Sequence, residues 1–301
     1  MALELVKLDN ATLPAIANAI RAKTGDTALL LPSQMPTAIA SIQSGVGSGA
    51  KEPYIEETYD ANGNLIDANL VGYTTIRPYA FYKCPSLALT SLPSGLTSVG
   101  EYAFGSCTNL ALTSLPSGLT SIGKSAFSGC TNLALTSLPS GLTSIGEYAF
   151  SKCTSLALTS LPSGLTSIET YAFYNCASLA LASLPSGITS IGGNAFRNCT
   201  SLALTSLPSG LTSIGDYAFQ NCTRLALTSL PSGLTSIGYN AFYNCTGLTS
   251  ITFQGKPDSI YSSAFTGCTN LKTINVPWAS GAVSGAPWGA TNATINYNYT
   301  G

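Results

Sequence analysis

The stretch from Leu110 to Asn132, LALTSLPSGLTSIGKSAFSGCTN, decides the fold because the chain repeats it at a constant interval. Its clearest marker is an Ala-Phe pair followed, three residues after the phenylalanine, by a cysteine. Successive cysteines are separated by 23 residues throughout: Cys84, Cys107, Cys130, Cys153, Cys176, Cys199, Cys222, Cys245 and Cys268. A fixed period of this size is typical of stacked supersecondary units. The sequence therefore predicts a mostly β solenoid of about nine coils.

Stacking in register places equivalent side chains of successive coils above one another in a dry core. We predict a core ladder of cysteines and phenylalanines: Cys107, Cys130, Cys153, Cys176, Cys199, Cys222, Phe104, Phe127, Phe150 and Phe173. The cysteine count is odd, and the parallel Cβ vectors of stacked cysteines suit disulfide geometry badly. A row of metal sites is the other alternative, but the chain has no histidine and no C-x-x-C pair. We expect buried free thiols and no metal.

Within one coil, two extended stretches are expected on opposite sides. Leu110 and Leu112 alternate with Ala111, as in a strand with one buried face. Pro116 cannot donate to a β ladder and should end that strand. After the turn, the segment from Leu119 to Ile122 predicts the second extended stretch.

Composition limits the function. Charged residues make up 8% of the chain and the net charge is −1, which argues against nucleic acid as a partner. No apolar run is long enough to insert into a membrane, and the charged segment 1–10 does not resemble a signal peptide. We find no catalytic constellation, no metal site and no cofactor motif. The one acidic cluster, near a predicted hairpin, is interpreted as a solvated face: Glu52, Glu56, Glu57, Asp60 and Asp67.

Variation between the copies is concentrated on either side of the Ala-Phe pair. In a stack these positions form one edge, rich in tyrosine, which offers a flat apolar ring and a hydroxyl at low entropic cost. The candidate binding edge consists of Tyr102, Tyr148, Tyr171, Tyr174, Arg197, Tyr217, Tyr239 and Tyr243. Two interpretations remain open: a binding edge for a neutral glycan or a protein, or the least constrained turn of the repeat.

The sequence divides into five parts. Residues 1–43 predict a small helical attachment module, and 44–53 a flexible linker. Residues 54–86 predict a capping hairpin, with its tight turn at Asn62-Gly63, followed by a half repeat. Residues 87–270 form the solenoid and 271–301 a C-terminal cap. Trp278 and Trp288 are expected to cover the open end, with an aromatic platform for sugars as the alternative.

The pattern L-x-x-x-x-L-P-x-x-L-x-x-I-x-x-x-A-F-x-x-C, over roughly residues 70–277, closely resembles the leucine-rich repeat of bacterial surface antigens, the BspA-like family. The resemblance implies a non-catalytic binding or adhesive solenoid. Ile251 and Ile274 keep the aliphatic residue that the family has three positions after the first leucine. The inner copies have a threonine there, such as Thr113, so the inward-facing set of that stretch stays open.

The ends carry a second resemblance. Segments 17–26 and 31–42, together with the endings 276–278 and 286–299, are similar to parts of bacteriophage tail proteins. This implies a virion tail protein assembled in the host cytoplasm, without a signal peptide. Residues 1–43 would bind other tail proteins, the solenoid would contact a host surface glycan or protein, and a trimer is possible. The alternative is a bacterial adhesive leucine-rich repeat protein that binds host or matrix protein.

Overall fold

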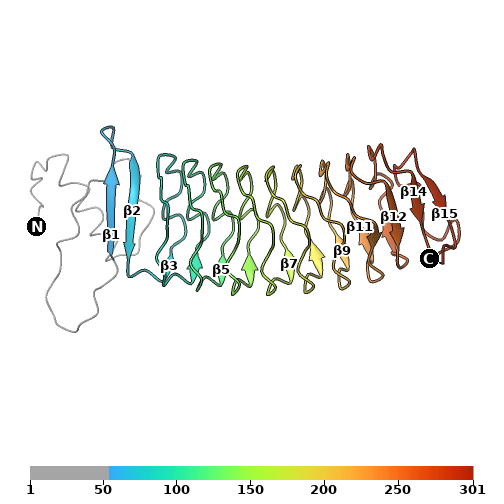
Figure 1. Cartoon of the computed structure of the whole chain (residues 1–301), viewed down its shortest axis with the longest axis horizontal. Coiled ribbons are helices and arrows are strands. Elements are labelled where there is room, and N and C mark those ends of the chain that lie inside the picture. Colours follow the sequence, from blue (N-terminus) through green and yellow to red (C-terminus); the bar gives the residue numbers. More distant parts are fainter. Residues whose placement is uncertain (1–53, 301) are drawn as a thin grey trace, which may run out of the picture.

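The computed structural model describes residues 54–300, which form one long stack of coils (Figure 1). The predicted helical module 1–43 and linker 44–53 lie outside the described residues. At one end, strands β1 (Tyr54–Tyr59) and β2 (Leu65–Val71) pair antiparallel as the predicted hairpin. Gly63, in its turn, has a φ of 78°. Between residues 54 and 300, no helix is long and apolar enough to cross a lipid bilayer.

Each coil contributes a short Ser-Ile strand to a parallel ladder that runs along the stack. These strands are β3 (Thr75–Ile76), β4 (Ser98–Val99), β5 (Ser121–Ile122), β6 (Ser144–Ile145), β7 (Ser167–Ile168), β8 (Ser190–Ile191), β9 (Ser213–Ile214), β11 (Ser236–Ile237) and β13 (Ser259–Ile260). Equivalent residues face one another, as Ile122 faces Val99. The isoleucines point inward and are buried, which confirms the second extended stretch of the repeat.

The first extended stretch differs from its prediction. Leu110 and Leu112 are both fully buried, as their alternation indicates, but no strand forms there. Within the described residues 54–300, strands on this side occur only near the C-terminus: β10 (Ser229–Leu230), β12 (Ser250–Phe253), β14 (Thr273–Asn275) and β15 (Thr294–Asn296). The predicted strand is therefore wrong for the inner coils. Leucine favours extended backbone less than the β-branched Ile251 and Ile274, which occupy the paired strands β12 and β14.

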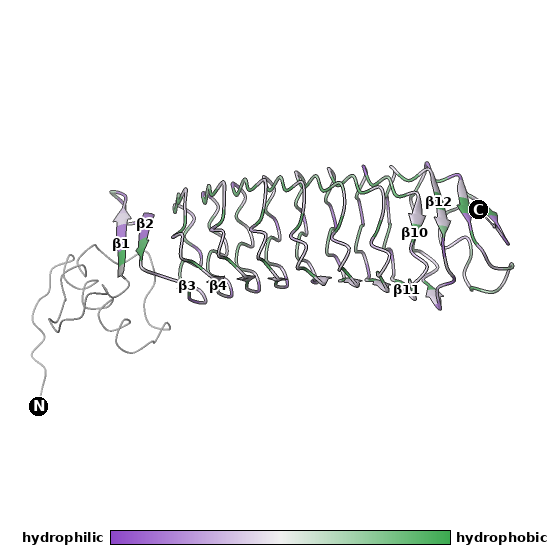
Figure 2. Ribbon diagram, turned by 60° about the horizontal axis from the view of Figure 1, so that its bottom comes forward, coloured by the Kyte–Doolittle hydropathy of each residue, from purple (hydrophilic) through white to green (hydrophobic). Residues whose placement is uncertain are grey.

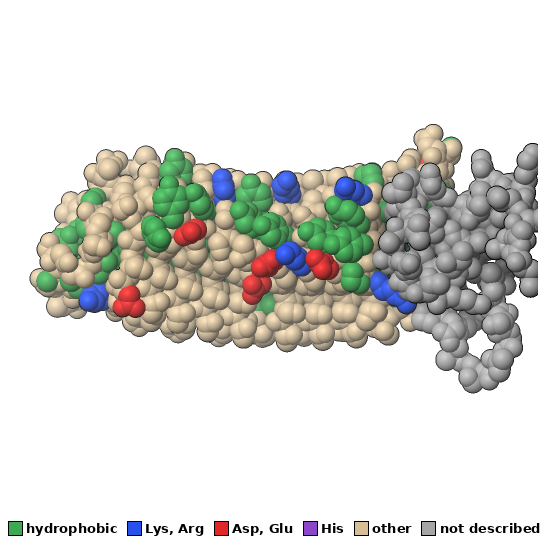
Figure 3. All heavy atoms as spheres, turned by 180° about the vertical axis from the view of Figure 1, so that it is seen from behind, with side chains coloured by type: hydrophobic (Ala, Val, Ile, Leu, Met, Phe, Trp, Pro, Cys, Tyr) green, Lys and Arg blue, Asp and Glu red, His purple; other side chains and the backbone are tan. Residues whose placement is uncertain are grey.

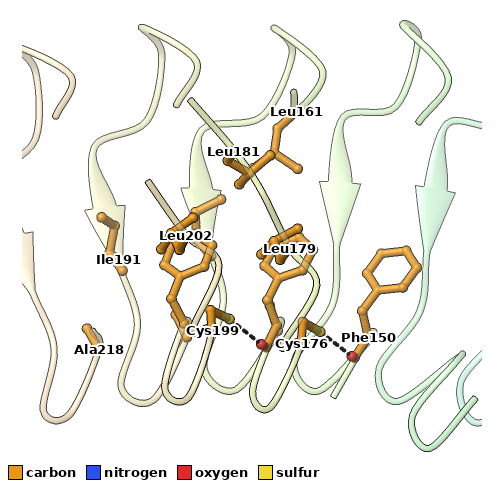
Figure 4. Close-up of a cluster of buried hydrophobic side chains, with 14 of the residues drawn as sticks. Phe150, Leu161, Cys176, Leu179, Leu181, Ile191, Cys199, Leu202 and Ala218 are labelled. Atoms are coloured by element: carbon orange, nitrogen blue, oxygen red, sulfur yellow. Dashed lines mark hydrogen bonds between the residues drawn. The ribbon is translucent and has the colours of Figure 1, made fainter. Parts of the chain in front are cut away.

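The core is a column of stacked phenyl rings beside a column of thiols. Neighbouring rings of the phenylalanine ladder lie nearly parallel, with centroids 5.7 Å apart for Phe150 and Phe173 and 5.5 Å for Phe173 and Phe196. All nine cysteines are free and buried. Each inner thiol donates to a phenylalanine carbonyl of the preceding coil, as Cys199 Sγ does to Phe173 O at 3.0 Å (Figure 4). Hydrophobic residues recur at equivalent places in successive coils (Figure 2).

Two tryptophans close the C-terminal end of the column. Trp288 is fully buried and Trp278 is 6% exposed. Both rings contact Phe253, and Trp288 Nε1 donates to Ser284 O at 2.8 Å. Because both indoles are packed into the end of the core, they offer no open face for a sugar. Their burial fits the expectation that they cover the open end of the solenoid.

The Ser-Ile ladder is interrupted once, between β6 and β7, where one coil departs from the consensus. Most coils have glycine directly after the isoleucine. A Cβ added at Gly192, for instance, would lie 2.6 Å from the Thr170 backbone nitrogen of the preceding coil. The fifth coil carries Glu169 instead, and the strands form two separate sheets on either side of this junction. The last strand of the ladder is followed by Tyr261, whose backbone nitrogen still donates to Ile237 O at 3.1 Å.

Replacing Glu169 by glycine should therefore join the two sheets. The variant can then form two backbone hydrogen bonds that the other junctions have. The nitrogen of residue 166 would donate to Thr143 O, and the nitrogen of residue 169 would donate to Ile145 O. At about 0.5–1.5 kcal/mol each, less the entropic cost of glycine, we expect the free energy of unfolding to rise by about 1 kcal/mol. Urea unfolding and amide exchange at 166–169 measure this.

The matched control is Glu147→Gly, which removes a glutamate from the same kind of loop without adding a ladder bond. Glu147 follows Gly146 and pairs with Lys124 at 3.0 Å, so its replacement should lower stability slightly. If Glu169→Gly is no more stable than the natural chain, the close approach of the backbone is not what separates β6 from β7.

Candidate binding edge

The loop around each Ala-Phe pair has the same unusual backbone. In the fourth coil, Tyr148 and Lys152 flank Phe150 with φ values of 57° and 63°, in the left-handed region. Backbone bonds to the next coil hold the loop, as Phe150 N donates to Ala172 O at 2.9 Å and Lys152 N to Tyr174 O at 2.6 Å. The loops therefore stack in register, and their side chains form one continuous edge of the solenoid.

The two left-handed positions of this loop differ in residue type. Two residues after the phenylalanine stand mainly residues that tolerate positive φ: Lys83, Ser106, Gly129, Lys152, Asn175, Asn198, Asn221, Asn244 and Gly267. Two residues before it stand mainly tyrosines: Tyr79, Tyr102, Ser125, Tyr148, Tyr171, Asn194, Tyr217 and Asn240. Left-handed backbone is costly for a bulky residue, and Asn194 and Asn240 show that asparagine fits this position. Backbone preference therefore does not explain why tyrosine stands at this position, and the explanation must lie in the contacts of its side chain.

The tyrosine rings gather in groups along the edge, visible as separate patches in Figure 3. We call the set the tyrosine edge: Tyr79, Tyr82, Tyr102, Tyr148, Tyr171, Tyr174, Arg197, Tyr217, Tyr239 and Tyr261. Near the N-terminal end, Tyr79 stacks on Tyr102 at 5.0 Å and Tyr82 meets both edge-on. In the middle, Tyr148 stacks on Tyr171 at 4.5 Å.

Arg197 joins the middle group to the C-terminal one. Its guanidinium carbon lies 5.8 Å from the ring centroid of Tyr174 and 5.4 Å from that of Tyr217. Further along, Tyr239 contacts both Tyr217 and Tyr261 edge-on, at 5.3 and 6.2 Å. A nearly unbroken run of rings and one cation thus extends over the second half of the stack.

The structure brings together seven of the eight predicted edge residues through ring or cation contacts. Tyr243 is half-buried and has no ring partner within the part of the chain that the structure describes. The predicted set did not include Tyr79, Tyr82 and Tyr261. Tyr79 stands two residues before Phe81, in the same register as Tyr102, so the repeat alignment contained its signal. Tyr261 occupies the glycine position after Ile260, and only its contact with Tyr239 places it on the edge.

A shallow groove of about 380 Å³ runs beside the C-terminal half of the tyrosine edge. Serine, glycine and isoleucine residues of the Ser-Ile strands line it, together with Glu169, Asp216 and Tyr261. Both carboxylates are engaged locally, because Ser167 Oγ donates to Glu169 and Tyr239 N donates to Asp216 Oδ1 at 2.7 Å. The groove offers hydrogen bonds to a ligand but no deep apolar pocket.

Among residues 54–300, the titratable groups show no arrangement suited to catalysis. Burial raises the pKa of Tyr148, with Tyr171 adding to the shift, so its hydroxyl is less ready than an ordinary tyrosine to act as a base or nucleophile. Burial also raises the pKa of the Cys84 thiol to about 11 and that of Cys107 to about 12, which leaves no reactive thiolate.

The acidic side chains of the hairpin accept hydrogen bonds from other residues of the hairpin. Tyr59 donates to Glu57, Asn69 to Glu56, and the Asn64 side chain and backbone to Asp60. Glu52 lies outside the described residues. Over residues 54–300 no three His, Cys, Asp or Glu side chains gather as a metal site would require.

Comparison with known proteins agrees with the repeat. The family described as BspA type leucine rich repeat region matches residues 74–203 and 190–283, in six copies. A leucine-rich repeat protein from Bacteroides ovatus is similar over 82% of this chain and 76% of its own, with 23% identity and a TM-score of 0.56. The T. pallidum leucine rich repeat protein shares 30% identity over 72% of this chain and 87% of its own, with a TM-score of 0.44.

A leucine rich cell surface protein from Faecalibacterium prausnitzii shares 23% identity over 84% of this chain and 97% of its own, with a TM-score of 0.38. No curated protein matches the chain. The family match lies within the repeats, so the resemblance of the two ends to phage tail proteins stays a prediction, as do the attachment role of 1–43, the trimer and the virion location.

Proposed function

Because the chain belongs to the BspA type leucine-rich repeat family, we propose that it is a non-catalytic adhesive protein whose tyrosine edge binds the surface of another cell or its matrix. Several features support the proposal. The repeats build a rigid straight arm, and the edge collects aromatic rings, amides and hydroxyls along it, which are the groups that recognition surfaces use.

One observation carries the proposal: tyrosine occupies the left-handed position where asparagine would fit at lower cost. Tolerated variation would be expected to remove Tyr148, Tyr171 and Tyr217 in favour of residues like Asn194. A binding role explains why the rings remain, because residues held in costly backbone conformations concentrate at functional sites.

The triple variant Tyr148→Asn, Tyr171→Asn, Tyr217→Asn tests the edge. Asparagine already occupies this position in two coils, so the fold should persist. We expect binding to epithelial cells or to deposited extracellular matrix to fall by about tenfold or more, as for the loss of interface hot spots. Flow cytometry with the labelled full chain measures it.

The control is the triple variant Thr113→Asn, Thr136→Asn, Thr205→Asn, which alters three exposed residues away from the Ala-Phe loops. It should bind like the natural chain. Unchanged binding by a folded tyrosine triple variant would refute the edge. Binding to bacterial cells, and not to epithelial cells or matrix, would favour the phage tail interpretation over adhesion.

A further inference from the structure

One flank of the tyrosine edge carries only cations. Three positions before the phenylalanine the charges are mixed, with Glu101, Glu147 and Asp216 but also Lys124, which pairs with Glu147. Three cations stand one or two positions after it, on the opposite flank: Lys83, Lys152 and Arg197. Figure 3 shows basic side chains in a line along one margin of the tyrosine patches, and acidic side chains with basic ones among them along the other. We call the first margin the basic flank.

Arg197 is the preorganised member of the basic flank. The rings of Tyr174 and Tyr217 lie against its guanidinium, and Nη1 donates to Asn194 Oδ1 at 3.2 Å. Rings against the faces of a guanidinium leave its edge for bidentate hydrogen bonding to a carboxylate. Since Nε is buried while the residue is partly exposed, the terminal amino groups are what a ligand reaches.

The positive charge of Arg197 has no acidic partner among residues 54–300, where the one ion pair is Lys124 with Glu147. Asp216, on the following coil, accepts instead from Tyr239 N. Two buried polar atoms at equivalent positions of neighbouring coils, Arg197 Nε and Gln220 Oε1, also lack a partner. Arg197 therefore carries a positive charge that no acidic group among the described residues neutralises.

The spacing of the cations indicates what kind of anion fits. Coils are about 4.8 Å apart, so Lys83, Lys152 and Arg197, on the first, fourth and sixth coils, are separated by roughly 14 and 10 Å. DNA carries a charge about every 1.7 Å and needs a denser row of cations than this. An acidic protein partner would be expected to insert apolar anchors into pockets, and the edge has none. A linear chain with widely spaced carboxylates and many hydroxyls matches both the charges and the tyrosines.

We propose that the basic flank binds an acidic polysaccharide that lies parallel to the solenoid axis, with one carboxylate held by Arg197 between Tyr174 and Tyr217. This rests on the proposed function of the tyrosine edge and names the class of its ligand. Lys83, which lies over the Tyr82 ring at 5.2 Å, and the exposed Lys152 meet further carboxylates of the same chain.

The test uses the full chain and hyaluronate, a matrix polysaccharide with a carboxylate on every second sugar, in biolayer interferometry. The methyl ester of hyaluronate, which has the same backbone without the charge, should bind about tenfold more weakly. Arg197→Gln should lose about tenfold or more and Arg197→Lys less, since lysine keeps the charge but not the planar fork. Glutamine stands at the equivalent position as Gln220, so the fold accepts it.

Arg224→Gln, an exposed cation away from the edge, is the control and should change nothing. Equal loss in Arg224→Gln and Arg197→Gln would mean unspecific attraction and overturn the proposal. Tighter binding to polyglutamate or to single-stranded DNA would also overturn it. If Arg197→Gln binds hyaluronate and cells normally while the tyrosine triple variant does not, the carboxylate site at Arg197 is wrong and the binding edge stands.

Discussion

Raising the pH from 7 to 10 should lower the free energy of unfolding by about 10 kcal/mol. The cause is the thiol column. Burial holds the pKa of every cysteine above its ordinary value of 9.0, to about 11 for Cys84, to about 12 for Cys107 and Cys268, and further for several others. In the unfolded chain the same thiols ionise near 9.

The sign follows from the protons bound in each state. Above pH 9 the unfolded chain releases protons that the folded chain keeps, so stability falls as the pH rises. One pH unit above the unfolded pKa, each thiol contributes about 1.4 kcal/mol of destabilisation, and nine thiols act together. The effect begins near pH 9 and ends for Cys84 near 11, where the folded thiol ionises too.

Urea unfolding followed by circular dichroism at pH 7, 9 and 10, under reducing conditions, measures this dependence. The matched variant is Cys130→Ala, Cys153→Ala, Cys176→Ala, which is expected to be less stable at pH 7 but to lose about a third less between pH 9 and 10. Stability that is equal at pH 7 and pH 10 would contradict burial of the thiols in a dry column.

Replacing Phe173 by alanine should lower the free energy of unfolding by about 3–5 kcal/mol. The ring is completely buried and stacks on Phe150 and Phe196, at 5.7 and 5.5 Å. Its loss leaves a cavity that the flanking coils cannot close, because their register is held by backbone bonds on all sides. In a solenoid whose coils are stabilised by their neighbours, both interfaces of the fifth coil weaken together.

The neighbouring residue provides the control. Tyr174→Ala removes a half-buried ring from the edge and should cost about 1 kcal/mol or less, since little buried volume is lost. Urea unfolding of both variants at pH 7 compares them directly. Equal losses would show that the phenylalanine column does not carry the stability of the stack. In Phe173→Ala we also expect an additional, partly unfolded state, because the stack can separate into two parts at the cavity.

The sequence alone predicts some elements of this structure and not others. The solenoid, the hairpin around Gly63 and the Ser-Ile extended stretch follow from spacing and turn chemistry, and the structure has all three. The expected strand at Leu110 does not form, because alternation of burial does not require complete pairing between coils. The left-handed backbone of Tyr148 could not be predicted from the sequence either, because bulky residues such as tyrosine rarely adopt a positive φ.

By itself, the sequence determined the period, and with it the register of every coil and the identity of the buried side chains, because an exact repeat puts like residues above like. Only the tertiary structure decided where that regularity ends and what the edge displays. The ladder is open at Glu169 because the bonded junctions on either side place the backbone within 3 Å of the glycine's Cβ position. Glycine, which has no Cβ, permits this approach in the adjoining coils. The place of Arg197 between Tyr174 and Tyr217 depends on contacts across three coils, which spacing along the chain does not specify.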